Sequence, residues 1–177
     1  MYIFFALVFV FCLVMFFVTS NNKRKQEEYF RRENISARSE FLIHATGLPI
    51  PEGIYCTVTS YPDRINIKAD NFDVNLDKSK LVNVCIKSET DIQKYYVSSA
   101  GGAIAGAMTF GALGALVGGR AKEKSSKVVK KYLIFTYQKS DELQYFSFDC
   151  TKALNCQAFV SEFNKSAKGQ EQIHIDL

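Results

Sequence analysis

The residues that come nearest to a nucleotide-binding motif lie in a glycine-rich run, SSAGGAIAGAMTFGALGALVGGRAKEK, from Ser98 to Lys124. Its segment GALVGGRA has the glycine spacing of a phosphate loop, but Arg120 and Ala121 stand where the loop needs a lysine and a serine or threonine. The amine that reaches the phosphates and the hydroxyl that holds magnesium are therefore both missing. Because no GxGxxG sequence occurs either, we predict that the chain binds no nucleotide cofactor.

Cysteine and histidine residues show no metal-binding or catalytic spacing. His44 and His174 lie far apart, and the five cysteines include no CxxC pair, so we predict no metal site and no cofactor. An odd number of cysteines favours reduced thiols, although the sequence leaves open a disulfide between Cys150 and Cys156. Since no motif brings serine, histidine and acidic residues together, we predict no catalytic residues and a non-enzymatic protein.

Membrane contact is the chemistry that the sequence does support. The uncharged run from Tyr2 to Val18 is about as long as a helix needs to cross 30 Å of hydrocarbon. It lacks the preceding basic residues and the small-residue cleavage site of a signal peptide, which predicts a transmembrane anchor at residues 1–20. Basic residues follow this run, so we expect a single pass with the N-terminus outside and the domain in the cytoplasm, at the cell membrane.

Residues 21–46 are rich in helix-forming side chains, which predicts a juxtamembrane helix ended by Gly47. The formal net charge of +4 is mild, and its cations gather in clusters, which favours an acidic membrane surface over nucleic acid. A solvated spacer helix is the alternative, because glutamates dilute the patch. The predicted membrane-surface residues here are Lys23, Arg24, Lys25, Arg31 and Arg32.

After the turn GLPIPEG, the apolar residues alternate with polar ones, which is typical of strands with one buried face. We predict six short strands, at residues 54–59, 65–69, 72–76, 82–86, 131–138 and 143–150. A helix capped by Asp149 or Thr151 and ended by Gly169 follows them, and residues 170–177 form a tail. The fold class is therefore α+β, mainly β: a small antiparallel barrel or bent sheet capped by a C-terminal helix.

This order of elements resembles the pleckstrin-homology-like superfamily, in particular its GRAM-like and bacterial branches. The resemblance covers about Leu48 to Ser166 and rests on three stretches, GLPIPEGIYCTV, the glycine-rich run with its flanks, and FSFDCT. The chain also resembles bacterial membrane proteins in which a glycine-rich insert interrupts such a domain. The resemblance implies a pleckstrin-homology-like domain at residues 47–169 that binds or scaffolds, with no catalytic residues.

The glycine-rich insert, residues 97–121, lies between the fourth and fifth predicted strands. One membrane crossing here would place the two halves of the sheet on opposite sides of a bilayer, so we predict a helical hairpin that returns to the side it left. Its small residues favour close helix packing, as in a glycine zipper. The predicted helix-packing residues are Gly102, Gly106, Gly111, Gly114 and Gly118, and the predicted membrane-surface residues after them are Lys122, Lys124 and Lys127.

Two positions remain open for the hairpin, which can enter the bilayer or pack on its own domain. The leading functional prediction is a membrane-anchored binding or scaffold module that acts at the cytoplasmic face. Its expected partners are membrane lipids, a protein of unknown identity and further copies of the chain that associate through the hairpin, with no nucleic acid. The alternative is a glycine-zipper protein that oligomerises to perturb or permeate the membrane, as toxins and holins do.

Overall fold

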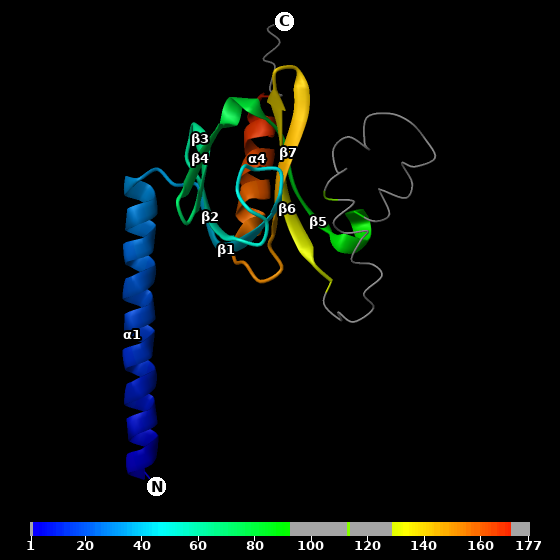
Figure 1. Cartoon of the computed structure of the whole chain (residues 1–177). Helices are drawn as coiled ribbons and strands as arrows, with labels where there is room; N and C mark the ends of the chain where they lie inside the picture. The colour runs from blue at the N-terminus through cyan, green and yellow to red at the C-terminus, as the bar shows by residue number, and fades with distance from the viewer. Residues whose placement is uncertain (1, 93–112, 114–128, 171–177) are drawn as a thin grey trace, which may run out of the picture. The chain divides into compact units, whose positions relative to one another are not determined.

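The computed structural model describes residues 2–92, 113 and 129–170, without the side chains of residues 2, 3, 5–8, 10 and 168–170 (Figure 1). The chain forms two compact units, Met1–Ile35 and Ser36–Leu177. The first unit contains helix α1 (Tyr2–Arg32), and the second contains an antiparallel sheet and helix α4 (Cys156–Gln170). The strands are β1 (Ala37–Thr46), β2 (Tyr55–Ser60), β3 (Arg64–Ala69), β4 (Phe72–Asp77), β5 (Leu81–Ser88), β6 (Lys131–Lys139) and β7 (Glu142–Asp149), with a short 3-10 helix, η1 (Lys78–Lys80).

Helix α1 joins the predicted anchor and the start of the predicted juxtamembrane helix into one element. Among the residues that the structure describes, no helix is both long enough and apolar enough to cross a membrane, and the transmembrane prediction for residues 1–20 is not confirmed. Its last turn consists of Tyr29, Phe30, Arg31 and Arg32. The helix ends at Arg32, since Asn34 adopts a left-handed backbone with φ 53°.

The prediction of a helix over residues 21–46 is wrong beyond Arg32, because residues 37–46 form strand β1. A β-bulge between Ser39 and Leu42 explains the error. Ala37 and Ser39 are buried before the bulge, whereas Leu42 and His44 are buried after it, so the alternation changes phase within the strand. Strand β1 pairs with β2 on one side and β7 on the other, and so it lies at the centre of the sheet.

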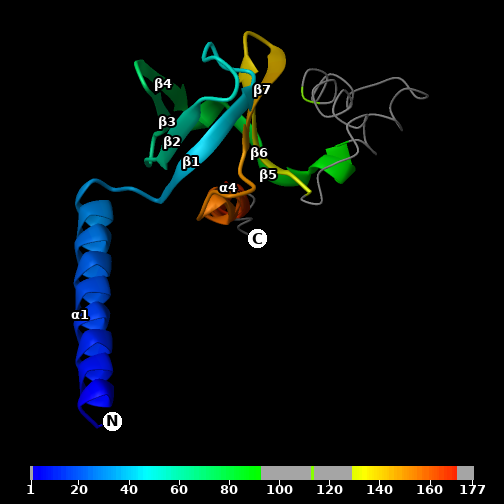
Figure 2. The ribbon, with the colours of Figure 1, turned by 60° about the horizontal axis from the view of Figure 1, so that its bottom comes forward.

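The seven strands form one open antiparallel sheet with the order β4-β3-β2-β1-β7-β6-β5, and α4 packs against β5 and β1 (Figure 2). The predicted antiparallel sheet and C-terminal helix are therefore confirmed, in the form of an open sheet with one more strand than expected. Helix α4 begins at Cys156, later than predicted, because Asp149 accepts hydrogen bonds from the backbone and hydroxyl of Thr151 instead of capping the helix.

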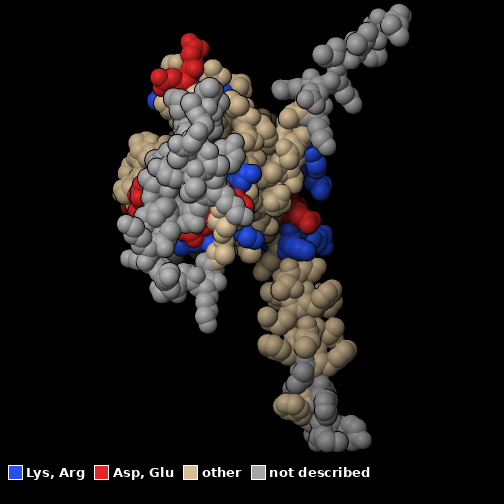
Figure 3. Space-filling model, turned by 90° about the vertical axis from the view of Figure 1, so that its right-hand side faces the viewer, with Lys and Arg blue, Asp and Glu red and all other residues tan. Residues whose placement is uncertain are grey.

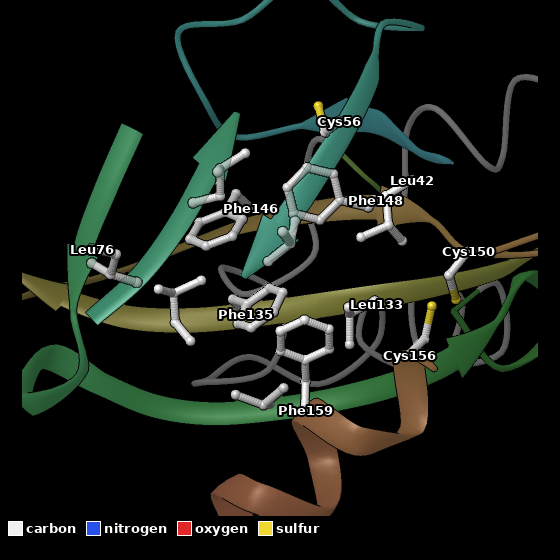
Figure 4. Packing of buried hydrophobic residues seen from close by; sticks show 14 of the residues in the cluster. Leu42, Cys56, Leu76, Leu133, Phe135, Phe146, Phe148, Cys150, Cys156 and Phe159 are labelled. Carbon is white, nitrogen blue, oxygen red and sulfur yellow. The ribbon is translucent and has the colours of Figure 1, made fainter. Parts of the chain in front are cut away.

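The inner core lies between the sheet and α4, and its centre is a group of aromatic rings (Figure 4). Phe135 stacks on Phe146 with ring centroids 5.0 Å apart and meets Phe148 and Phe159 edge to face. Such edge and offset contacts are the favoured aromatic geometries. Phe159 comes from α4, so this one side chain ties the helix into the aromatic centre of the sheet.

A second core covers the opposite face of the sheet. Leu133 and Phe135 of β6 point into the inner core, whereas Tyr132 and Ile134, which alternate with them, are buried in the second one, as the alternation of a strand requires. The second core contains Ala45, Ile92, Leu113, Tyr132 and Ile134, with Cys85 and Tyr145 packed against it. The sheet is therefore apolar on both faces over β6.

Gly47 marks the sharp turn after β1. Its φ is +98°, and a Cβ atom at this position would collide with the backbone of Tyr145 and Phe146 in β7. The sequence suggested Gly47 as a helix terminator, but its role is the close approach of two backbones.

Candidate functional site

Helix α1 exposes large apolar side chains on all of its sides. Residues 13–18 are consecutive, and every one of them is exposed and apolar. Because consecutive helical residues point about 100° apart, this run covers the whole circumference rather than one stripe. The exposed large apolar residues of the helix include Phe4, Phe9, Phe11, Leu13, Val14, Met15, Phe16, Phe17 and Val18. The part of α1 at residues 13–18 is therefore apolar around its whole circumference.

The first polar side chain after this run, Thr19, is satisfied within the helix. Its hydroxyl lies 2.9 Å from the carbonyl oxygen of Met15 and 3.0 Å from that of Phe16, to which it donates. A hydroxyl bonded in this way needs no water. Thr19 therefore marks the point along α1 where apolar side chains are followed by polar and basic ones.

Five predicted membrane-surface residues, Lys23, Arg24, Lys25, Arg31 and Arg32, lie on α1 beyond Thr19, and all are exposed. Figure 3 shows blue lysine and arginine side chains near one end of the tan helix. Arg32 pairs with Glu33 at 3.2 Å, and its guanidinium lies 5.9 Å from the centre of the Tyr29 ring. The other predicted membrane-surface residues, Lys122, Lys124 and Lys127, lie outside the described residues. So do all five predicted helix-packing glycines, Gly102, Gly106, Gly111, Gly114 and Gly118.

One residue of the glycine-rich insert, Leu113, is described, and it is fully buried in the second core. Its backbone N–H donates to the hydroxyl of Tyr145 on β7 at 3.0 Å. Both a side-chain contact and a backbone hydrogen bond thus join this point of the insert to the sheet. Of the two positions that the sequence left open for the insert, packing on its own domain is the one that Leu113 adopts.

An exposed aromatic pair lies over the ends of β1 and β2. Phe41 sits in the bulge with φ 60°, a strained conformation for an aromatic residue, and its side chain is 70% exposed. Tyr55 is 64% exposed, and the two rings border a depression of about 910 Å³. Lys130, Asp149, Thr151 and Lys152 complete this aromatic-basic depression, together with Ile43.

No pattern in the sequence indicates the aromatic-basic depression. Its residues come from β1, β2, the end of β7 and the segments next to β6 and β7, and only the sheet order brings them together. Tyr55, Ile43 and Asp149 are cross-strand neighbours in register. Lys130 lies 3.4 Å from Asp149, which leaves Lys152 as the lining cation without an ion pair in the described part of the chain.

A second hollow, of about 440 Å³, lies between α4 and the segment that connects β4 with β5. Its floor includes Phe135 and Phe159, and Lys78 and Glu162 form an ion pair of 2.5 Å at its side. Both side chains of the pair are about four-fifths buried, so they join the connecting segment to α4. Among the described residues that line this hollow, the serines have no histidine beside them and Glu162 is the one carboxylate, so neither a catalytic triad nor a carboxylate pair is present there.

His44 holds the loop that follows β1 through two hydrogen bonds. Its Nδ1 lies 3.2 Å from the carbonyl oxygen of Pro51, and its Nε2 accepts a hydrogen bond from the backbone N–H of Leu48 at 3.3 Å. With Nε2 as the acceptor from Leu48, Nδ1 is the nitrogen that donates to Pro51. In the described part of the chain, no three histidine, cysteine, aspartate or glutamate side chains are grouped so that they could hold a metal ion.

Comparisons with known proteins add no relationship, since no family model, no curated protein and no solved structure matches this chain.

Proposed function

We propose that this protein is a non-enzymatic binding module that is anchored to the cell membrane by α1 and acts at its cytoplasmic face through lipid or protein contacts. The observation that carries the proposal is the change along α1 from exposed apolar side chains to exposed cations within one helix. Apolar side chains gain free energy in hydrocarbon, and each cation near an anionic surface contributes about 1 kcal/mol.

The position of the basic residues along α1 supports the proposed orientation of the chain in the membrane. Lys23, Arg24 and Lys25 follow the uncharged run on its C-terminal side, and positive residues are retained in the cytoplasm. All five cysteines are free thiols, which agrees with a reducing compartment. The sheet domain then lies in the cytoplasm, beside the inner leaflet.

The order of elements supports a pleckstrin-homology-like domain as the binding module. Strands follow one another in antiparallel pairs, and a single C-terminal helix packs on the bent sheet. Within this module we propose the aromatic-basic depression as the contact surface. Exposed aromatic side chains next to Lys152, which has no ion pair among the described residues, suit both an anionic lipid headgroup and an acidic protein segment.

The anchor is tested by charged substitutions in α1. Phe9→Lys combined with Leu13→Lys should release the protein from isolated membranes during an alkaline carbonate wash, whereas the unchanged protein should stay in the pellet. Leu143→Lys is the matched control, because Leu143 is equally apolar and exposed but lies in the sheet domain. Equal retention of all three proteins would contradict the anchor.

A liposome experiment separates the proposed function from membrane permeation. Full-length protein should bind vesicles that contain anionic lipid without releasing an encapsulated dye. Dye release that rises steeply with protein concentration would instead favour the glycine-zipper alternative.

A further inference from the structure

Cys150 and Cys156 lie together at the junction between the sheet and the C-terminal helix. Cys150 follows the last residue of β7, and its backbone N–H donates to the carbonyl oxygen of Lys131 at 2.8 Å, which fixes it beside β6. Cys156 is the first residue of α4. The two sulfur atoms face each other across the short connection, and both residues are buried (Figure 4).

The polar surroundings of the pair distinguish the two thiols. The thiol of Cys150 donates a hydrogen bond to the sulfur of Cys156, and this bond lowers the pKa of Cys156, although burial opposes the effect. The Ser39 hydroxyl, 3.5 Å from the Cys156 sulfur, lowers the same pKa further. The same thiol–thiol bond, with burial, raises the pKa of Cys150. Cys156 is therefore the first of the pair to lose its proton, as the position at a helix N-terminus also favours.

We propose that Cys150 and Cys156 form an oxidation site, at which a peroxide converts the two thiols into a reversible intrachain disulfide. The Cys156 thiolate attacks one oxygen of hydrogen peroxide, the O–O bond breaks, and the departing hydroxide takes up a proton to give water. Cys156 is then a sulfenic acid. Cys150 gives up its proton and attacks the Cys156 sulfur, the S–O bond breaks, and a second water leaves as the S–S bond forms. Two thiols thereby supply the two electrons that reduce one peroxide, and an external dithiol reverses the reaction by thiol–disulfide exchange.

The disulfide would fix α4 to the sheet. In the reduced protein residues 150–155 connect β7 to the first turn of α4, and no covalent bond fixes this turn to the sheet. The helix is held by apolar packing, in which Phe159 is buried, and by the Lys78–Glu162 ion pair. A covalent link at Cys156 prevents this turn from separating. Opening of α4 should therefore become rarer after oxidation, which amide hydrogen exchange over residues 156–167 measures directly.

The experiment uses the full chain in detergent micelles, treated with hydrogen peroxide, blocked with N-ethylmaleimide and digested with trypsin. Cleavage after Lys152 separates the two cysteines, so a disulfide joins peptide 140–152 to peptide 153–165. We expect this cross-linked pair to appear with peroxide and to disappear with dithiothreitol. Cys85→Ser, which removes a partly buried thiol on β5, should leave its yield unchanged.

Single variants test the order of the two steps with dimedone, which reacts with sulfenic acids. Cys150→Ser should retain a sulfenic acid on Cys156 and gain the dimedone adduct there, whereas Cys156→Ser should give no adduct on Cys150. The proposal is overturned if peroxide oxidises the exposed Cys12 but yields no cross-linked pair in the unchanged protein. Equal dimedone labelling of the two variants would overturn the assigned roles.

Discussion

Burial also raises the pKa of a third thiol, Cys56, so the stability of the inner core depends on pH. Cys56 is a core residue of β2, and burial raises the pKa of its thiol to about 11, although a hydrogen bond from the backbone of His44 opposes this rise. A thiol that ionises less readily in the folded state stabilises that state only while it stays protonated. Its contribution is complete below the unfolded pKa and is lost as pH rises through the folded one.

Alkaline pH should therefore destabilise the domain in part through Cys56. We expect the free energy of unfolding of fragment 36–177 to fall between about pH 9 and pH 11, with about 2 kcal/mol of the fall assigned to this thiol. Cys56→Ala removes the titration, so the stability advantage of the unchanged fragment over the variant should shrink by that amount. Urea unfolding at pH 8 and pH 11 gives both values, and a constant advantage would contradict the argument.

Leu113 is the second residue with a consequence for the fold. It is fully buried in the second core with Ile92 and with Tyr132 and Ile134 of β6, so Leu113→Ala should leave a cavity there. We expect a loss of about 2 to 4 kcal/mol in the free energy of unfolding, measured with urea on fragment 36–177. Val82→Ala is the control, because Val82 is exposed on β5, and it should change stability by less than about 0.5 kcal/mol. Equal effects would mean that Leu113 contributes nothing to the core.

At the scale of the element, the sequence predicted well where alternation was regular. Strands β2 to β7 all overlap their predicted ranges, because most of them alternate apolar and polar residues between turn residues and β6 is a short apolar run of strand length. Strand β1 was missed, since its bulge changes the phase of burial and its Ala, Arg, Glu and Leu side chains are good helix formers. Regular periodicity allows a strand to be recognised from the sequence. A bulge forms only when two strands pair, so the sequence alone does not reveal it.

The candidate sites also differ in whether their residues are close together in the sequence or are brought together by the fold. The cations on α1 are close together in the sequence, so they could be selected from the sequence alone. Their contact with a membrane surface stays a prediction. The aromatic-basic depression depends on the register of β2, β1 and β7, and the facing of Cys150 and Cys156 depends on where α4 begins. Leu113 was one of several similar apolar residues in the insert, and nothing in its neighbourhood distinguished it. Contacts that are remote along the chain need the fold before they can be recognised.

The β1 bulge also supports a prediction about strain. Phe41 has φ 60°, which costs an aromatic residue on the order of 1 to 2 kcal/mol, whereas glycine adopts this conformation freely. Phe41→Gly should therefore raise the free energy of unfolding by about 1 kcal/mol, while it weakens vesicle or partner binding if the exposed ring makes contact. Tyr55→Gly, the matched change at an ordinary strand position, should lower stability by about 1 kcal/mol. A loss of stability in both variants would show that the bulge stores no strain.

At the scale of the whole molecule, the order of apolar helix, cations and sheet domain makes a prediction about sidedness. A thiol introduced by Asn71→Cys, in the exposed turn between β3 and β4, should react with a membrane-impermeant maleimide only after cells are permeabilised. Tyr2→Cys is the control at the opposite end of α1 and should react in intact cells. Both variants should also lack Cys12, which is exposed on the helix. The reverse labelling pattern would place the domain outside.

The short connection between α1 and β1 has a consequence for encounter rates. Four residues separate Arg32 from Ala37, and four residues extend by about 14 Å at most. With α1 held in the membrane as we propose, a domain tethered this closely would search a thin layer along the bilayer instead of the volume of the cell. A ligand in the same leaflet is then met at a high effective concentration, so even a weak intrinsic affinity produces substantial occupancy. A ligand that diffuses freely in solution gains nothing from the tether, which makes the length of this connection a determinant of specificity in its own right.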